Sequence, residues 1–431
     1  MKKWQRMKRV DIFLLVLIIW IFYDSEIFAE ATLQQQIDQT PAGGTLVVKS
    51  GTFGEPITID KSITIKGSVD SILTYTGDQS FINITGQNVH LMNLEIEATG
   101  FSSIEESAIV LSGKGHTLNG LTIKSVGTGI KLDKANQVKV TESSFIGTSE
   151  GHAIDLWESS HNQFTNNSIR DVQDGFYVEY SHHNTFRDNT IRDAHYGIHL
   201  MYSNFCLLEG NKSADNFTGA MIMGAEAAEV RKNYFLENSE NVNSHGLLLY
   251  DSRNVIVAEN EVSRNRIGIF IEKASMNTVK ANRIQANFVG VQFKESKDNQ
   301  VYRNDFLGNV NDAQAVNSEG NQMDGNYWDA SSKIDSDGDG ISELTYQADP
   351  YFLALTGEVP EYQLFFQAPG MSILQKMLKS MDAELLTDSK PLMESTHLSV
   401  RTDRPELPVW LISGFMFVCS LYLFYLGRKQ R

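Results

Sequence analysis

The side chains best suited to chemistry in this sequence are one histidine and three methionines, in the stretches His199-Leu-Met201 and Met221-Ile-Met223. Within each stretch the two residues are separated by one apolar residue, as on one face of a β-strand. Imidazole nitrogen and thioether sulfur form a soft ligand set, which favours Cu(I) over zinc, calcium or magnesium. If the two stretches lie side by side, they form a candidate Cu(I) site.

A repeat of 22 residues predicts that they do lie side by side. The steps between eight asparagines are 22, 22, 22, 27, 22, 22 and 22 residues, and a glycine series has its long step at the same place. A five-residue insertion therefore lies between Asn233 and Gly246. Self-similarity at a fixed period indicates a solenoid. The two series are Asn167, Asn189, Asn211, Asn233, Asn260, Asn282, Asn304 and Asn326, and Gly175, Gly197, Gly219, Gly246, Gly268 and Gly290.

Each repeat holds three short runs in which apolar and polar residues alternate. Alternation with period 2 predicts strands, and three strands with their turns fit one coil of an all-β, single-stranded, right-handed parallel β-helix. Asparagine suits a corner because its amide can bond the same amide one coil away, and glycine fits a tight bend. About a dozen coils are expected, from about residue 45 to 328, behind a short cap helix that begins at Leu33. A leucine-rich repeat has a similar length, but its leucine-dominated pattern is absent.

The repeat also predicts which side chains face outward. Residues one and three after each glycine are apolar and are expected inside, so residues two and four point outward. With coils about 4.8 Å apart and alternate residues about 6.6 Å apart, a solvent-facing two-by-two square results, here called the His–Met square: His199, Met201, Met221 and Met223. An outward apolar patch of this kind is also typical of a protein contact. Two further candidate ligands, which can otherwise serve corner hydrogen bonds, are His195 and His245.

A second candidate metal site is an acidic loop beyond the repeats. Asp335, Asp337 and Asp339 stand at positions 1, 3 and 5 of a run that resembles the first half of a calcium loop. Glu343 at position 9 can complete a compact loop. Tyr346 stands where an EF-hand has its bidentate acid, so this is no EF-hand. The alternative is a plain Asp/Gly turn.

A polysaccharide site is the alternative from a different functional class. Parallel β-helices often cleave or epimerise acidic polysaccharides, which requires carboxylates and a base in one groove. Candidate acids do lie on adjacent coils, which leaves a carbohydrate site open, but beyond them the outward face turns to methionine and leucine, and no nucleophile motif or phosphate loop is present. The candidate residues for such a site are Asp155, Glu158, Asp174, Tyr177 and Glu179.

Both ends of the chain carry signals for export and anchoring. Residues 1–29 have a basic start, an apolar stretch and a small final residue, which is typical of a signal peptide. Residues 407–427 are nearly all apolar and residues 428–431 are basic, which predicts a transmembrane helix with a cytoplasmic tail. The net charge, 37 − 53 = −16, argues against nucleic acid as a partner. Cys206 and Cys419 cannot pair, because one lies in the solenoid and the other in the membrane span.

Between the capped solenoid, residues 30–328, and the membrane span, residues 329–406 break the repeat. Part of this tail has apolar residues at helical spacing, which predicts an amphipathic helix. That helix either packs on the end of the solenoid or docks a membrane partner. Its candidate docking residues are Leu374, Met377, Leu378 and Met381.

Several stretches resemble the NosD family of nitrous oxide reductase maturation. They are Tyr196-Gly-Ile-His199-Leu-Met201-Tyr202-Ser-Asn204, His245-Gly-Leu-Leu-Leu-Tyr250, Gly325-Asn-Tyr-Trp328-Asp329 with Asp337-Gly-Asp-Gly-Ile341, and Asp388-Ser-Lys-Pro-Leu-Met393. The resemblance implies an extracytoplasmic protein that works with a NosY-like ABC permease and its NosF-like ATPase. It also implies a NosL-like lipoprotein as copper donor and a NosZ-like nitrous oxide reductase as client. Proteobacterial members are soluble and periplasmic, so the predicted C-terminal anchor is a departure that suits a Gram-positive cell.

These observations lead to one hypothesis and one alternative. The hypothesis is a membrane-anchored, extracytoplasmic maturation factor, not an enzyme, that accepts or relays Cu(I) beside an ABC transporter, with calcium as a candidate ion for the acidic loop. The alternative is a β-helix that binds polysaccharide or modifies it as a lyase or epimerase.

Overall fold

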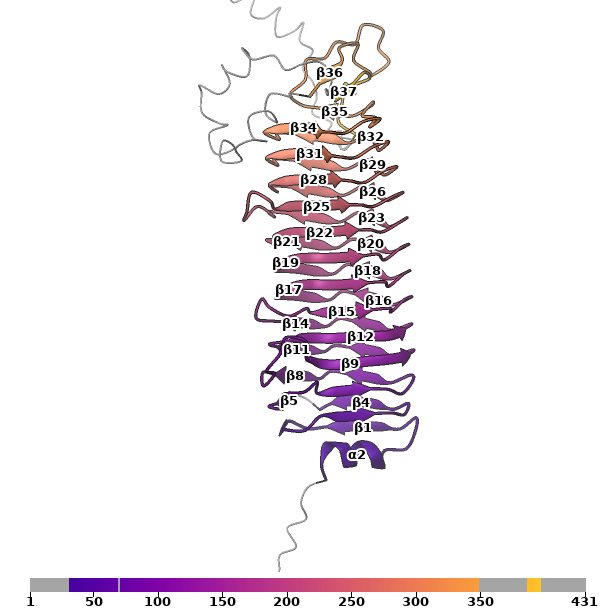
Figure 1. Cartoon of the computed structure of the whole chain (residues 1–431), viewed down its shortest axis with the longest axis vertical. Coiled ribbons are helices and arrows are strands. Elements are labelled where there is room, and N and C mark those ends of the chain that lie inside the picture. Colours follow the sequence, from indigo (N-terminus) through magenta and orange to yellow (C-terminus); the bar gives the residue numbers. More distant parts are fainter. Residues whose placement is uncertain (1–30, 69, 349–385, 397–431) are drawn as a thin grey trace, which may run out of the picture.

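The computed structural model of the protein describes residues 31–348, apart from residue 69, and residues 386–396. Over these residues the chain is a parallel β-solenoid of about 13 turns with almost no helix (Figure 1). The prediction of an all-β solenoid is thus confirmed, while the right hand of the coil stays a prediction. Helix α2 (Leu33–Gln39) covers the N-terminal end, as predicted.

Three strands per coil stack into two long parallel sheets of 12 and 23 strands. The 12-stranded sheet contains β1 (Thr45–Val48), β4 (Thr64–Gly67), β7 (His90–Met92), β10 (Thr117–Asn119), β13 (Lys139–Thr141), β16 (Gln163–Thr165), β18 (Thr185–Arg187), β20 (Leu207–Glu209), β23 (Glu229–Arg231), β26 (Ile256–Ala258), β29 (Thr278–Lys280) and β32 (Gln300–Tyr302).

The 23-stranded sheet combines two strand positions of each coil. One position holds β3 (Ile57–Ile59), β6 (Ile82–Ile84), β9 (Ser107–Lys114), β12 (Thr128–Asn136), β15 (Ile154–Trp157), β17 (Ser168–Glu179), β19 (Thr190–Met201), β22 (Thr218–Met223), β25 (His245–Tyr250), β28 (Ile267–Glu272), β31 (Val289–Lys294) and β34 (Asn311–Val316). The other holds β2 (Gly51–Phe53), β5 (Ile72–Tyr75), β8 (Glu95–Ala98), β11 (Thr122–Ser125), β14 (Ser144–Ile146), β21 (Lys212–Ala214), β24 (Tyr234–Leu236), β27 (Glu261–Ser263), β30 (Arg283–Gln285), β33 (Asp305–Leu307) and β35 (Tyr327–Trp328). Strands β17 and β19 are long enough to cover both positions.

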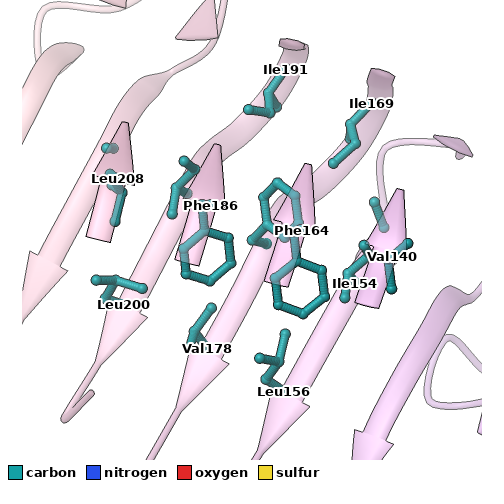
Figure 2. Close-up of a cluster of buried hydrophobic side chains, with 14 of the residues drawn as sticks. Val140, Ile154, Leu156, Phe164, Ile169, Val178, Phe186, Ile191, Leu200 and Leu208 are labelled. Atoms are coloured by element: carbon teal, nitrogen blue, oxygen red, sulfur yellow. The ribbon is translucent and has the colours of Figure 1, made fainter. Parts of the chain in front are cut away.

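The core consists of like side chains stacked coil upon coil. Phe164 and Phe186 stack with ring centroids 5.2 Å apart, and Val178 and Leu200 line the opposite wall (Figure 2). Val178, Leu200 and Ile222 are fully buried, which confirms the predicted inward positions after each glycine. Burial of such side chains contributes about 1.5–3 kcal/mol each, so the apolar columns are a main source of stability.

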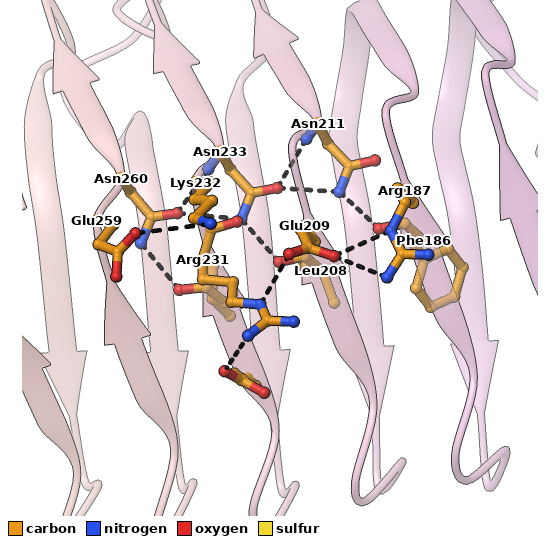
Figure 3. Close-up of polar contacts among 12 residues, drawn as sticks. Phe186, Arg187, Leu208, Glu209, Asn211, Arg231, Lys232, Asn233, Glu259 and Asn260 are labelled. Atoms are coloured by element: carbon orange, nitrogen blue, oxygen red, sulfur yellow. Dashed lines mark hydrogen bonds and ion pairs between the residues drawn. The ribbon is translucent and has the colours of Figure 1, made fainter.

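The asparagine series forms a buried ladder of hydrogen bonds. In each step the backbone N–H and the side-chain Nδ2 of one asparagine donate to Oδ1 of the asparagine one coil further on. For Asn211 these bonds to Asn233 are both 2.9 Å, and the pattern continues to Asn260 (Figure 3). Asn211 Nδ2 also donates to the carbonyl oxygen of Phe186, at 2.8 Å. The ladder spans the 27-residue step unchanged, as the predicted insertion requires.

The glycine series serves coil-to-coil contact. A Cβ on Gly246 would lie 2.7 Å from the carbonyl oxygen of Gly268 on the next coil. Their φ angles lie outside the left-handed region. The expected reason, a tight bend, is therefore replaced by close approach of neighbouring coils.

The C-terminal end of the solenoid is closed by a returning segment. Strands β36 (Tyr346–Gln347) and β37 (Thr387–Asp388) pair antiparallel. Trp328 stacks between Phe306 and Tyr346, at centroid distances of 4.1 and 3.9 Å. Asp388 accepts hydrogen bonds from the backbone N–H of Asn326 (2.9 Å) and from Trp328 Nε1 (2.8 Å). The segment of the tail from 386 to 396 thus belongs to the fold of the solenoid.

Four predicted features lie outside the described residues. These are the signal peptide (1–29), the docking residues of the tail helix (Leu374, Met377, Leu378 and Met381), the membrane span (407–427) and the basic tail (428–431). Among the described residues, no helix has the length and apolar character needed to cross a membrane.

Candidate functional site

Strand pairing assembles the His–Met square as predicted. In the register of β19 and β22, His199 lies opposite Met221, and Met201 lies opposite Met223. On the preceding coil, β17 places Tyr177 beside His199 and Glu179 beside Met201. The three methionines are half-buried on the outward face of the sheet. Three thioethers and one imidazole therefore share a single patch.

The histidine of the square, in contrast, is not solvent-facing. His199 is only 9% exposed, because the rings of Tyr196 and Tyr177 lie beside it with centroids 4.6 and 5.5 Å away. Three coils further on, Phe270 is likewise only 8% exposed, with the ring of His245 stacked on it. The expectation of a fully exposed patch is wrong for His199, since large outward side chains cover one another on a flat sheet.

A buried carboxylate holds His199 from the coil below. Nδ1 of His199 lies 3.2 Å from Oδ2 of Asp174, which is 2% exposed. Nδ1 of His152 lies 3.7 Å from the same oxygen. Within the described part of the chain, Nε2 of His199 and Oδ1 of Asp174 are buried without a hydrogen-bond partner. The arrangement leaves one imidazole nitrogen available as a ligand.

Asp174 was not assigned to the metal site from sequence. It precedes Gly175 and lies in register with Tyr196 and Thr218, at the start of the outward face. Register alone places it diagonally from His199, and its reach to that ring depends on side-chain conformations. The predicted outward positions, two and four residues after each glycine, do not include it, so the repeat pattern gave no signal for this contact.

Carboxylates gather on the coils that precede the square. Tyr177 donates a hydrogen bond to Glu179 at 3.0 Å, and burial together with that acceptor raises the pKa of Tyr177. Burial likewise raises the pKa of Asp155, which pairs with Tyr177 in register. With Asp174, four of the five residues of the polysaccharide alternative thus share one face. The fifth, Glu158, is exposed at a corner, 3.8 Å from Lys134.

The two additional histidines do not join the square. His195 is exposed and stacks on Phe217 at 4.6 Å. His245 lies two coils from Tyr196 in a different outward row, with Nδ1 3.4 Å from the hydroxyl of Thr218. Burial lowers the pKa of His245 to about 4, so it is neutral at physiological pH. His195 and His245 are therefore packing residues in this arrangement.

The acidic loop brings together three of its four predicted residues. Ligand oxygens of Asp335, Asp337 and Glu343 lie within 4.8 Å of one another, while Asp339 stays outside this group. The same carboxylates cap backbone N–H groups: Asp335 accepts from Gly340 at 3.0 Å, and Glu343 from Ser336 at 2.8 Å. The geometry fits a calcium ligand set and equally fits a hydrogen-bonded turn.

Cys206 supplies no metal ligand. It is 1% exposed, and burial raises the pKa of its thiol to about 12. A thiol of that kind stays protonated, whereas metals bind the thiolate.

The tripeptide His-Leu-Met occurs a second time, at His90-Leu-Met92 on β7 of the 12-stranded sheet. Its outward neighbours in register are Thr64 and Lys66 on one side and Thr117 and Asn119 on the other. No carboxylate within the described part of the chain hydrogen-bonds His90 there. The second tripeptide thus offers one histidine and one methionine, but its neighbours on the adjacent coils add no further soft ligand.

The fold and this site define the chain as a parallel β-solenoid with soft metal-ligand side chains on an outward sheet face. Residues 138–337, which include the whole His–Met square, match the family described as "Periplasmic copper-binding protein (NosD)". The match confirms the resemblance over this stretch, which is consistent with a NosD-family β-helix protein.

Comparison with solved structures finds enzymes that share only the fold. The Azotobacter vinelandii mannuronan C-5 epimerase AlgE6 A-module is 14% identical, with a TM-score of 0.57 over 66% of this chain and 90% of that one. A Yersinia enterocolitica family 28 exopolygalacturonase is 13% identical, with a TM-score of 0.54 over 68% and 75%. The periplasmic alginate epimerase AlgG is 16% identical, with a TM-score of 0.50 over 69% and 83%. No curated protein matches the chain.

Proposed function

We propose that the protein accepts or relays Cu(I) outside the cytoplasm, for assembly of the copper centres of nitrous oxide reductase. The copper part is supported by the family match over 138–337, whose description names a periplasmic copper-binding protein. The finer proposal includes the ABC permease and ATPase, the donor lipoprotein and the reductase client implied by the family resemblance. Anchoring by residues 407–427 belongs to the same proposal.

The observation that carries the copper proposal is the state of His199. One ring nitrogen faces Asp174, and the other is buried without a hydrogen-bond partner among the described residues, beside a methionine on the next coil. A buried polar atom without a partner is costly, by about 1–3 kcal/mol, unless it serves a ligand. Cu(I) is the ion whose preference for imidazole and thioether ligands fits this set.

Partial burial of the square suits transfer of the ion. A storage site would enclose its metal fully. Here Met201, Met221 and Met223 keep part of their surface open, so a partner protein can supply or remove a ligand at that side. His199 then acts as the fixed member and the methionines as the accessible ones.

The test is the double substitution Met201→Ala, Met223→Ala in the full-length protein. Both side chains lie outside the core, so the β-solenoid should stay folded, while Cu(I) affinity and copper loading of the client should be lost. Met92→Ala, which removes a half-buried outward methionine after a His-Leu pair on the other sheet, is the matched control. A double mutant that yields a fully copper-loaded client would reduce the square to a contact surface.

A second candidate function is polysaccharide binding or modification. Its support is the group of Asp155, Asp174, Glu179 and Tyr177 on neighbouring coils. The raised pKa of Tyr177 keeps its hydroxyl protonated at neutral pH, which is unfavourable for a base. Incubation with uronate polymers, followed by analysis of chain length and epimer ratio, distinguishes this function. Activity lost in Asp155→Asn but kept in Met201→Ala, Met223→Ala would favour it.

A further inference from the structure

We propose that Asp174 is the positioning residue of the His–Met square, holding His199 with its proton on Nδ1 and its lone pair on Nε2. The inference rests on the proposed function, since it assigns the orientation of a ligand in that same site. Asp174 would not touch the copper ion. It would act through the imidazole that does.

The geometry of the contact supports this role. Oδ2 of Asp174 lies 3.2 Å from Nδ1 of His199, and Asp174 is 2% exposed. Water therefore has little access to this carboxylate, and the hydrogen bond has little competition. The rings of Tyr196 and Tyr177 lie beside the imidazole and restrict its rotation. The carboxylate then selects which nitrogen carries the proton.

The proton position follows from the hydrogen-bonding groups of a neutral imidazole. One of its nitrogens is a donor and the other an acceptor, and a hydrogen bond at one fixes the role of the other. A carboxylate accepts and does not donate, so it requires N–H at Nδ1. The remaining nitrogen, Nε2, has no partner in the described part of the chain and keeps its lone pair for a metal. Carboxylates commonly orient metal-binding histidines in this way.

His152 gives the carboxylate a second neighbour. Its Nδ1 lies 3.7 Å from the same oxygen, beyond hydrogen-bond distance, and its ring stacks on Tyr177 at 4.8 Å. The group of Asp174, His152 and His199 is not a metal site of its own. The one set of three or more His, Cys, Asp or Glu ligand atoms found together in the described residues is that of Asp335, Asp337 and Glu343. His152 therefore packs around Asp174, and His199 is the imidazole that Asp174 orients.

The experiment compares Asp174→Ala and Asp174→Asn with Asp155→Asn in the full-length protein. Asp155 lies on the same face and has no hydrogen bond to His199, so it is the matched control. Nitrogen-15 NMR of histidine-labelled, metal-free protein reports the His199 tautomer, with His199→Gln to assign the signals. Competition with a Cu(I) chelator reports affinity.

Asp174→Ala should shift His199 from a single Nδ1–H tautomer to a mixture and weaken Cu(I) binding by about 10- to 100-fold. Asp174→Asn should show a smaller shift of the same kind, because its amide can either accept the Nδ1 proton or rotate and donate to a deprotonated Nδ1. Asp155→Asn should match the wild type in both readouts. If Asp174→Ala does not fold, as judged by circular dichroism, Asp174→Asn carries the test alone.

The inference is overturned if His199 keeps the Nδ1–H tautomer in the Asp174 variants, or if their Cu(I) affinity equals that of Asp155→Asn. Failure of the proposed function has a different signature. In that case wild-type protein and His199→Gln would bind Cu(I) equally, whatever the Asp174 variants do.

Discussion

The same tripeptide, His-Leu-Met, lies at two places in this solenoid with different surroundings. On β7, His90 and Met92 have Thr117 and Asn119 as their neighbours on the next coil. On β19, His199 and Met201 have Met221 and Met223 there, and Asp174 reaches His199 from below. In both, the leucine between them is fully buried.

The difference shows that a ligand pair becomes a candidate site only through the coils on either side. A strand of this solenoid offers two outward side chains about 6.6 Å apart, too few to bind a metal by themselves. In a parallel solenoid the remaining ligands come from residues 22 positions away, and the orienting group from about 25 positions before. The tripeptide alone carries none of this information.

The largest expected effect tests what the two tripeptides share. Leu91→Asp and Leu200→Asp should both prevent folding, because an unpaired charge in either apolar column costs several kcal/mol. Met92→Ser and Met201→Ser should both fold, as measured by far-UV circular dichroism and thermal unfolding. Equal behaviour of the leucine and methionine variants would contradict the assignment of inward and outward positions.

A second effect is the pH dependence of stability, which we expect from the buried histidine His245 on the coil that follows Met221 and Met223. His245 has a pKa of about 4 in the folded protein, against about 6.5 unfolded. Between these values the unfolded chain binds more protons, so stability is full above pH 6.5 and falls as the pH drops toward 4. The loss is roughly 3 kcal/mol.

Denaturant titrations at several pH values should show this slope in the wild type and a flatter curve in His245→Gln. The exposed His161, replaced by glutamine, is the matched control for the loss of an imidazole from the solenoid. His116, near the first tripeptide, also has a pKa lowered by burial, but its Nδ1 accepts from Val89 N–H. A curve for His245→Gln as steep as the wild type would assign the dependence elsewhere, first to His116.

A smaller effect is expected from building the missing neighbours at the first tripeptide. Thr117→Met with Asn119→Met would give His90 and Met92 a methionine pair on the next coil, in the register of β7 and β10. In a His199→Gln background, this variant should bind Cu(I) measurably, yet about 10- to 100-fold more weakly than the native square, since none of the described carboxylates orients His90. Affinity equal to the native square would show that the soft ligands suffice.

The smallest effect is expected far from both tripeptides, at the acidic loop. If Asp335, Asp337 and Glu343 bind calcium, chelation should lower stability, by about 1.4 kcal/mol relative to calcium at ten times its Kd. Asp337→Asn should abolish the response, while Asp339→Asn should keep most of it, because Asp339 lies outside the group. Thermal unfolding with and without chelator measures this. An unresponsive wild type would leave the loop as a turn.

Periodic features could be predicted from the sequence, because a fixed spacing determines them. The solenoid, the inward columns and the register that places His199 beside Met221 all follow from the 22-residue steps. The asparagine ladder does not extend over the whole solenoid. Its position lies two residues after each strand of the 12-stranded sheet, where the early coils have Leu94 and Leu121 and asparagine begins only at Asn167. The coils from Asn167 onward, which repeat most regularly, were therefore easier to predict from the sequence than the earlier coils.

Features that depend on side-chain size or on distant segments could not be predicted. The burial of His199 arises from the rings of Tyr196 and Tyr177, which no repeat specifies. A second asparagine ladder runs in parallel from Asn216 through Asn238, Asn265 and Asn287 to Asn309, and the sequence analysis did not predict it. Asp388 joins the solenoid from 62 residues beyond Asn326, a distance unrelated to the period.

Asp388 takes the place of the next asparagine at the end of the ladder. Each asparagine accepts hydrogen bonds from the coil before it and donates hydrogen bonds to the coil after it. Each one therefore needs an acceptor on the following coil. Asp388 accepts from Asn326 at 2.9 Å, but an ionised carboxylate has no proton to donate onward. The asparagine ladder therefore ends at Asp388, which satisfies the last backbone N–H of the ladder without continuing it.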